Sequence, residues 1–204
     1  MMMEQIRMRN YFYFLLAVAM FISVSHGCFA AEDTPENIPW SATLFYAKKT
    51  NDTVSDTFTF KADFPDNLDF VSLALARKFG TYKKTDLEFE GQIARHQGIE
   101  HYTEYTAAIF IRWETLPWDD VIDMSFAFGE GFSYTTRIPQ FESENNKPAA
   151  RFLNYLAYEA TFAVPKYKNW EAVLRMHHRS GIFGLFSGVR GASNAWAIGL
   201  RYNF

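Results

Sequence analysis

The chain has 204 residues, a length that fits one domain or two small ones. Hydrophobic residues make up 49% and aromatic residues 18%, which excludes an intrinsically disordered chain. The formal net charge of −3 offers no bulk positive charge for phosphate groups, so nucleic-acid binding has no electrostatic support. With a single cysteine, Cys28, neither an intrachain disulfide nor a cysteine-based zinc site can form.

Residues 1–30 have the pattern of a secretory signal peptide. Two arginines and the apolar run 11–24 precede Cys28 and Ala30, which occupy the small positions of a cleavage site. The run is short for a spanning helix, which needs about 20 residues, so an uncleaved anchor is the weaker alternative. A lipoprotein attached through Cys28 is a further alternative. We predict a signal peptide over 1–30 and one domain over 31–204.

Beyond residue 30, apolar residues alternate with small or polar residues at a period of two, which indicates half-buried β-strands. In the segment 71–76, for example, Val, Leu and Leu alternate with Ser, Ala and Ala. No run of 18 apolar residues follows the signal, so no transmembrane helix is expected. The eight predicted strand segments are 40–46, 71–78, 87–96, 104–113, 124–129, 156–162, 171–177 and 195–204.

Short connectors alternate with the long polar connectors 50–66 and 137–150. Short turns at one end and long loops at the other are typical of outer-membrane barrels, and Phe204 matches their aromatic C-terminal signature. We predict an all-β fold, an eight-stranded antiparallel up-and-down transmembrane β-barrel in the Gram-negative outer membrane, with short turns and termini in the periplasm. The aromatic residues expected at its membrane interfaces are Trp40, Trp113, Trp118, Tyr167 and Trp170.

A soluble lipocalin-like barrel or sandwich also alternates, but its apolar face points inward. Here the opposite faces carry small residues that fit a narrow lumen, and charges that neutralise one another inside it. The carboxylates expected in this internal salt-bridge network, rather than in catalytic pairs, are Glu88, Glu90, Glu104 and Glu159. By parity His177 faces the lumen, whereas His96 and His101 are expected in an outer loop region, too isolated to form a metal site.

The predicted seventh strand ends in a candidate nucleophile–base pair. His178 and Ser180 share a lipid-facing side by parity, with Cβ atoms about 7 Å apart, which suits serine acyl transfer. Asn194 on the last strand falls near His178 and is expected to orient its imidazole. The Gly181 N–H is expected to be free to approach a developing oxyanion. This chemistry requires neither a metal nor another cofactor.

The eight-strand plan and the H-x-S on the seventh strand resemble the lipid A deacylases of the PagL type. The segments Gly181–Phe204 and Gly129–Tyr134 are similar to proteins described as acyloxyacyl hydrolase-like. The resemblance implies an outer-membrane hydrolase that removes an ester-linked acyl chain from the lipid A of lipopolysaccharide. It implies Ser180 as the nucleophile and His178 as the base.

Two positions depart from that family. Its triad has a Glu on the eighth strand, where this chain has only Ser193 and Asn194, and its Ser is followed by Asn, where this chain has Gly181. Losing the triad carboxylate can cost several orders of magnitude in rate. The alternative is therefore a non-enzymatic small outer-membrane barrel with a structural or adhesive role, carried by its long loops. Transport is the weakest hypothesis, because side chains fill an eight-stranded lumen. The acyl chain removed and a homodimer are left open.

Overall fold

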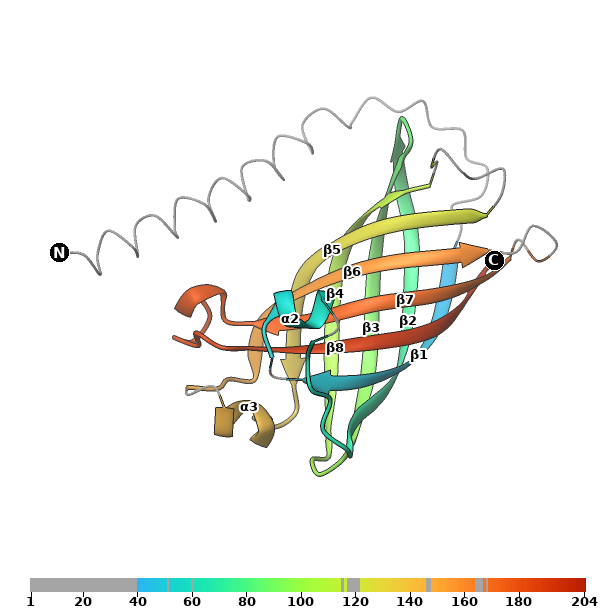
Figure 1. The fold of residues 1–204 in the computed structure, drawn as a ribbon. Coiled ribbons are helices and arrows are strands. Elements are labelled where there is room, and N and C mark those ends of the chain that lie inside the picture. The colour runs from blue at the N-terminus through green and yellow to red at the C-terminus, as the bar shows by residue number, and fades with distance from the viewer. Residues whose placement is uncertain are drawn as a thin grey trace. The chain divides into compact units, whose positions relative to one another are not determined.

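Eight antiparallel strands form a closed barrel in which each strand pairs with its neighbours in sequence and β8 pairs with β1 (Figure 1). The strands are β1 (Trp40–Thr50), β2 (Leu68–Tyr82), β3 (Thr85–Gly98), β4 (Tyr102–Trp113), β5 (Asp123–Thr135), β6 (Phe152–Ala163), β7 (Trp170–Ser180) and β8 (Ala192–Asn203). The computed structural model describes residues 40–50, 52–59, 61–114, 116, 122–145, 148–163, 167 and 169–204. The predicted signal peptide lies outside the described residues.

The long connectors 51–67, 136–151 and 181–191 gather at one end of the barrel, here called the loop end, together with the three-residue connector 99–101. The other connectors form the opposite turn end. At the loop end lie α2 (Val54–Phe58), α3 (Gln140–Asn145) and η2 (Ile182–Gly184). At the turn end, Lys83 and Lys84 form a two-residue hairpin turn, for which Lys83 adopts a left-handed φ of 58°. None of the helices in the described residues is long and apolar enough to cross a bilayer.

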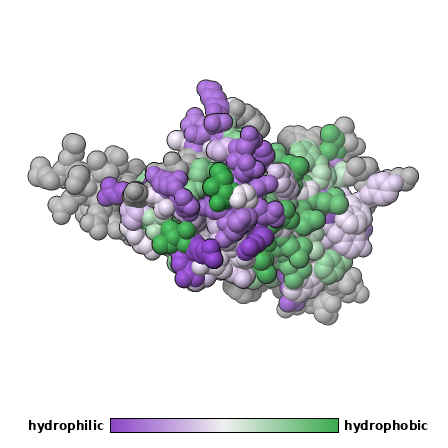
Figure 2. All heavy atoms as spheres, turned by 90° about the horizontal axis from the view of Figure 1, so that it is seen from below, coloured by the Kyte–Doolittle hydropathy of each residue, from purple (hydrophilic) through white to green (hydrophobic). Residues whose placement is uncertain are grey.

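The distribution of polarity is inverted relative to a soluble protein. Large apolar side chains on the outward faces of the strands are exposed, among them Leu44, Leu73, Ile93 and Ile198. On the face shown in Figure 2, apolar residues gather in one zone and hydrophilic residues gather beside it. The inward faces carry the buried charges described below. An apolar outer wall around a polar lumen is the organisation of a transmembrane barrel, so the soluble alternative is excluded.

Glu159 is the hub of an ion-pair network in the half of the lumen nearer the turn end. Its carboxylate accepts hydrogen bonds from Arg112 and Arg201, each at 2.7 Å, and from Arg175 at 2.6 Å. Arg175 also bonds Glu90 at 2.6 Å, and Arg112 bonds Glu88 at 2.9 Å. The predicted salt-bridge network is confirmed for these three glutamates, whose charges are neutralised by arginines of other strands.

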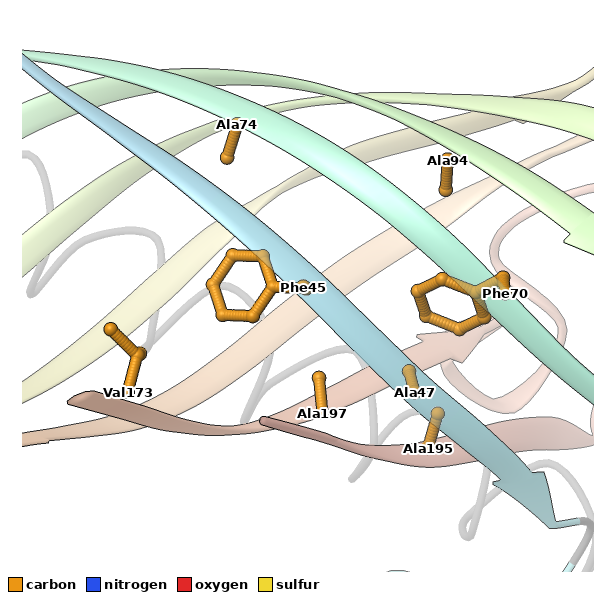
Figure 3. Close-up of a cluster of buried hydrophobic side chains, with 8 residues drawn as sticks. All are labelled: Phe45, Ala47, Phe70, Ala74, Ala94, Val173, Ala195 and Ala197. Carbon is orange, nitrogen blue, oxygen red and sulfur yellow. The ribbon is translucent and has the colours of Figure 1, made fainter. Parts of the chain in front are cut away.

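Two phenylalanine rings fill the lumen around Arg175, whose guanidinium lies 4.4 Å from the Phe45 ring centroid and 4.9 Å from that of Phe110. Glycines make room for them, because a Cβ atom at Gly199 or Gly129 would come within 2.5 Å of a ring atom. Phe45 belongs to the cluster drawn in Figure 3, in which small residues surround the rings. The cluster comprises Phe45, Ala47, Phe70, Ala74, Ala94, Val173, Ala195 and Ala197.

Glu104 lies nearer the loop end and has different partners from the other lumen acids. It accepts from His96 Nε2 at 2.8 Å, from Ser133 Oγ at 2.6 Å and from His177 Nε2 at 3.2 Å. The lumenal position of His177 is confirmed. His96 belongs to a strand, as the predicted segment 87–96 has it, but the expectation of an outer loop region was wrong: β3 extends past His96, which lies buried in the lumen, stacked on the Tyr102 ring at 4.0 Å.

Helix α3 covers the lumen at the loop end. Its Glu142 is buried, accepts from Ser193 Oγ at 2.7 Å and pairs with Arg179, and both partners face the lumen. Loop 3 of the barrel, residues 136–151, is thereby fastened to β7 and β8 from inside. Side chains fill the lumen and α3 covers its mouth, an arrangement that offers no support for the transport hypothesis.

A buried ion pair at the loop end ties two connectors to β1. Glu100 accepts hydrogen bonds from Lys49 Nζ at 2.7 Å and from the Phe141 N–H at 3.2 Å. Burial by itself raises the pKa of Glu100, but the Lys49 charge and these hydrogen bonds hold that pKa below its ordinary value. A depressed carboxyl pKa stabilises the folded state at neutral pH, and this contribution is lost as the pH falls through the folded pKa.

We therefore expect the Phe141 amide to lose protection against hydrogen exchange in acid, below the ordinary carboxyl pKa. The Glu100→Gln variant, whose side chain does not titrate, should show no such loss of protection in acid. Exchange mass spectrometry, corrected for the intrinsic pH dependence of exchange, measures both. A Glu100→Gln variant with the wild-type pH profile would refute the assignment.

Candidate functional site on the outer wall

His178 and Asn194 are direct partners in the register of β7 and β8. Neighbouring odd-numbered residues of β7 face the lumen, so His178 projects from the outer wall. The His178 Nδ1 and Asn194 Oδ1 atoms are 2.6 Å apart. The structure thus brings together the two residues that parity and hairpin spacing placed near each other.

This contact fixes the tautomer of His178. The Asn194 Oδ1 atom is only an acceptor, so Nδ1 of the neutral imidazole carries the hydrogen and Nε2 keeps its lone pair. The amide of Asn194 is itself held, because its Nδ2 donates to the Asp52 carbonyl at 2.6 Å. A carbonyl accepts and never donates, which excludes the flipped amide. His178 therefore presents an unprotonated Nε2, as a general base requires.

Ser180 lies two residues beyond His178 on the same face, between Asn154 of β6 and Ala192 of β8. Among the described residues, no hydrogen bond joins Ser180 Oγ to His178. Both side chains are buried, which shields this part of the wall from solvent and lipid. Catalytic hydrogen bonds are often long in unliganded enzymes and shorten only in the complex with substrate.

The expectation of a free N–H at Gly181 was wrong. This N–H donates to the Gly191 carbonyl at 3.3 Å, closing the loop between β7 and β8. A Cβ atom at position 181 would lie 2.0 Å from the Val189 carbonyl oxygen, so close packing accounts for the glycine. An oxyanion could receive this N–H only by displacing the existing bond.

A row of paired residues shows how deep each group lies in the wall. The row is traced from each residue to its partner on the next strand, starting at Trp40 at the turn end of β1. Because the strands are tilted, it closes on Thr50, at the loop end of the same strand. The row is Trp40, Arg77, Phe89, Ile109, Glu130, Leu156, His178, Asn194 and Thr50. Glu130 is thus half-way up the wall, and His178 and Asn194 are nearer the loop end.

Glu130 and Asn154 are polar members of this wall that the sequence reasoning missed. Asn154 Nδ2 donates to the Glu130 carboxylate and to the Gly131 carbonyl, the latter at 3.1 Å. Its Oδ1 is buried and has no hydrogen-bond partner among the described residues, and Ser180 is its neighbour across the strand pair. A carboxylate facing lipid is costly, so its presence at mid-depth indicates a functional role.

Loop 1, residues 51–67, folds back over the outer wall and covers the site from one side. Phe58 of α2 contacts the rings of Tyr158 and Trp196 at 5.3 and 5.8 Å, and these two flank Met176 in the register. Met176 consequently has 0% exposure although its position faces outward. The long polar connector 50–66 is therefore, over α2, part of the outer wall.

Within the part of the chain that the structure describes, no group of three or more His, Cys, Asp or Glu side chains has the arrangement of a metal site. The polar residues described above on the outer wall, here called the wall cluster, are Glu130, Asn154, His178, Ser180 and Asn194. Its chemistry is that of neutral and acidic hydrogen-bonding groups beside an apolar surface.

Solved outer-membrane barrels are similar in fold. The N-terminal β-barrel domain of Pseudomonas aeruginosa OprF matches with a TM-score of 0.53 at 9% identity, over 82% of this chain and 98% of that one. Neisserial surface protein A gives 0.49 at 9% identity, over 81% and 96%, and Ail of Yersinia pestis gives 0.41 at 14%, over 81% and 98%. No protein-family model and no curated protein matches the chain by sequence. The chain has the fold of the small eight-stranded outer-membrane β-barrels.

Proposed function

We propose that the chain is an outer-membrane serine esterase that removes an ester-linked acyl chain from lipid A. The observation that carries the proposal is the 2.6 Å contact between His178 Nδ1 and Asn194 Oδ1 on the outward face, beside Ser180. His178 is a neutral base with a free Nε2, and the Ser180 hydroxyl lies beside it at the loop end of the wall. This pair is placed to let Ser180 attack an ester of a lipid in the adjoining leaflet.

In this mechanism Ser180 Oγ attacks the ester carbonyl while His178 Nε2 takes its proton. His178 then gives the proton to the leaving alkoxide oxygen of lipid A, which departs as a hydroxyl, and the acyl chain stays on Ser180 as an ester. Water attacks this acyl-enzyme, again with His178 as the base, and the fatty acid leaves. Asn194 keeps the imidazole in the productive tautomer throughout, but it cannot neutralise the imidazolium as a carboxylate does.

Mass spectrometry of lipid A from Gram-negative cells that express the chain tests the proposal. Wild type should remove one acyl mass, and Ser180→Ala should leave lipid A unchanged at equal levels of folded barrel. Unchanged lipid A in wild-type cells, across several lipid A backgrounds, would refute the lipid A esterase.

Asn194 is a positioning residue in this mechanism, and two variants separate its roles. In Asn194→Asp the oxygen acceptor for His178 stays and a charge is added, but the donor to the Asp52 carbonyl is lost, so kcat should stay closer to the wild-type value than in a variant without an acceptor. In Asn194→Leu the acceptor is lost, and kcat should fall by about one to two orders of magnitude while KM changes little. The matched control is Ser193→Ala, on the lumen face of the same strand. Equal kcat in Asn194→Leu and wild type would show that the contact has no catalytic role.

A second candidate function is a non-enzymatic barrel with a structural or adhesive role. The low exposure of Ser180 and His178 and the bonded N–H of Gly181 favour it. In that case expression of Ser180→Ala would fully rescue the phenotype of a strain that lacks the chain. The lipid A composition would be the same in the wild-type, deletion and rescued strains.

A further inference from the structure

Loop 4, residues 181–191, is unusually apolar for a segment at the loop end. No ionisable residue occurs between Arg179 and Arg190. Phe183 is 74% exposed and Leu185 is 38% exposed, although connecting loops normally present polar groups to water. Exposed apolar groups of this kind indicate a surface that is covered by something other than water.

The loop holds these side chains out on a defined backbone. Hydrogen bonds join the Gly184 and Phe186 N–H groups to the Gly181 carbonyl, at 3.1 and 3.0 Å, and the Val189 N–H to the Phe186 carbonyl at 2.9 Å. Ile182 and Phe183 adopt left-handed φ values of 44° and 54°. Such conformations cost about 1–3 kcal/mol each in residues with a Cβ atom, and they cluster in ligand-binding segments.

The apolar surface of loop 4 is continuous with the lipid-facing wall. The Phe186 ring lies 6.2 Å from Phe132 and 5.8 Å from Phe152, both of which are exposed on the outward faces of β5 and β6. Loop 4 thus turns outward over the wall rather than inward over the lumen. Helix α3 of loop 3, by contrast, carries the exposed and charged Glu144.

The flanking charge has the sign and place expected at a membrane surface. Arg190 is exposed, and its stem lies beside Gly184, with Cγ 3.8 Å from the position of a Cβ atom there. A long basic side chain packed along an apolar segment, with its head in water, is typical of an interfacial position. Its positive charge complements the phosphate groups of an anionic lipid surface.

We propose that loop 4 is a membrane-inserting segment whose Phe183 and Leu185 side chains lie among the acyl chains of the outer leaflet. The partner is the lipid surface itself. Insertion here draws the leaflet against the end of β7, where Ser180 lies. The assignment rests on the geometry of the loop and holds whether or not the wall hydrolyses esters.

Spin-label accessibility in lipid nanodiscs tests this assignment. Nitroxide labels are placed singly at Phe183→Cys and Leu185→Cys in a Cys28→Ser background, with Ile93→Cys as the membrane control and Glu144→Cys as the aqueous control. Labels at 183 and 185 should collide with oxygen in preference to a nickel chelate, as at 93. Values at 183 and 185 like that at 144 would overturn the proposal. Dipolar broadening between labels at 183 would instead identify a second copy of the chain as the occupant.

A second measurement needs no substitution. Wild-type barrel in nanodiscs that contain a lipid with a photoreactive group in its acyl chain is irradiated and digested with trypsin. The single peptide from Ser180 to Arg190 contains the whole apolar segment. We expect lipid adducts on this peptide at Phe183 or Leu185. Adducts on the strands with none on this peptide would refute insertion.

Discussion

The His178→Gln variant is expected to lose ester hydrolysis by a factor of about 10²–10⁴, the range associated with removing a general base. Glutamine keeps much of the shape of the side chain and can still bond Asn194, but it cannot take a proton from Ser180. Purified barrel in detergent micelles, with fatty-acid release from lipid A followed over time, measures this loss.

His177→Gln is the matched control, because it changes the neighbouring histidine, which faces the lumen and bonds Glu104. This variant should unfold more readily but hydrolyse lipid A at the wild-type rate while folded. Equal losses of activity in both variants would place the effect in the fold of β7 and contradict the assignment of His178 as the base.

The Glu159→Leu variant should be severely destabilised. Its carboxylate, which is buried, is shared by Arg112, Arg175 and Arg201. Without it Arg112 keeps Glu88 and Arg175 keeps Glu90, but Arg201 keeps only the 3.5 Å contact with Glu171, so the buried positive charge exceeds the negative charge around it. Breaking one buried ion pair in this way costs about 3–5 kcal/mol, and here three arginines share the acid. Urea unfolding of the barrel in liposomes, followed by its heat-modifiable mobility on gels, should show a much lower midpoint or no folded barrel.

Glu171→Gln is the control for this experiment. Glu171 sits at the edge of the same network, is partly exposed and contacts Arg201 only at 3.5 Å. Its replacement should cost about 1 kcal/mol or less. A Glu159→Leu barrel as stable as the Glu171→Gln barrel would show that the lumen tolerates the excess of buried positive charge.

Period-two alternation was enough to predict the strands and the face of each side chain, because both depend only on local geometry. It placed Glu159 in the lumen and His178 opposite Asn194 without any knowledge of the fold. The same parity puts Glu130 with the apolar residues of β5, so its outward position was readable. It was missed because the predicted strand stopped at residue 129.

The course of loop 1 was beyond this reasoning. Its helix has a local signal, since Thr53 accepts from the Asp56 N–H as an N-cap, but nothing local says where the helix packs. That depends on Phe58 meeting Tyr158 and Trp196, which are distant in sequence. The bonded N–H of Gly181 likewise depends on the path of the whole loop to Gly191.

The most direct test of the account is whether Ser180 is an activated nucleophile. Folded barrel is treated with a fluorophosphonate, and the adduct is located by mass spectrometry within the peptide from Ser180 to Arg190. The account predicts one adduct, on Ser180, in wild type and His177→Gln, and almost none in His178→Gln. No adduct on folded wild-type barrel, or labelling of Ser180 that does not depend on His178, would contradict it.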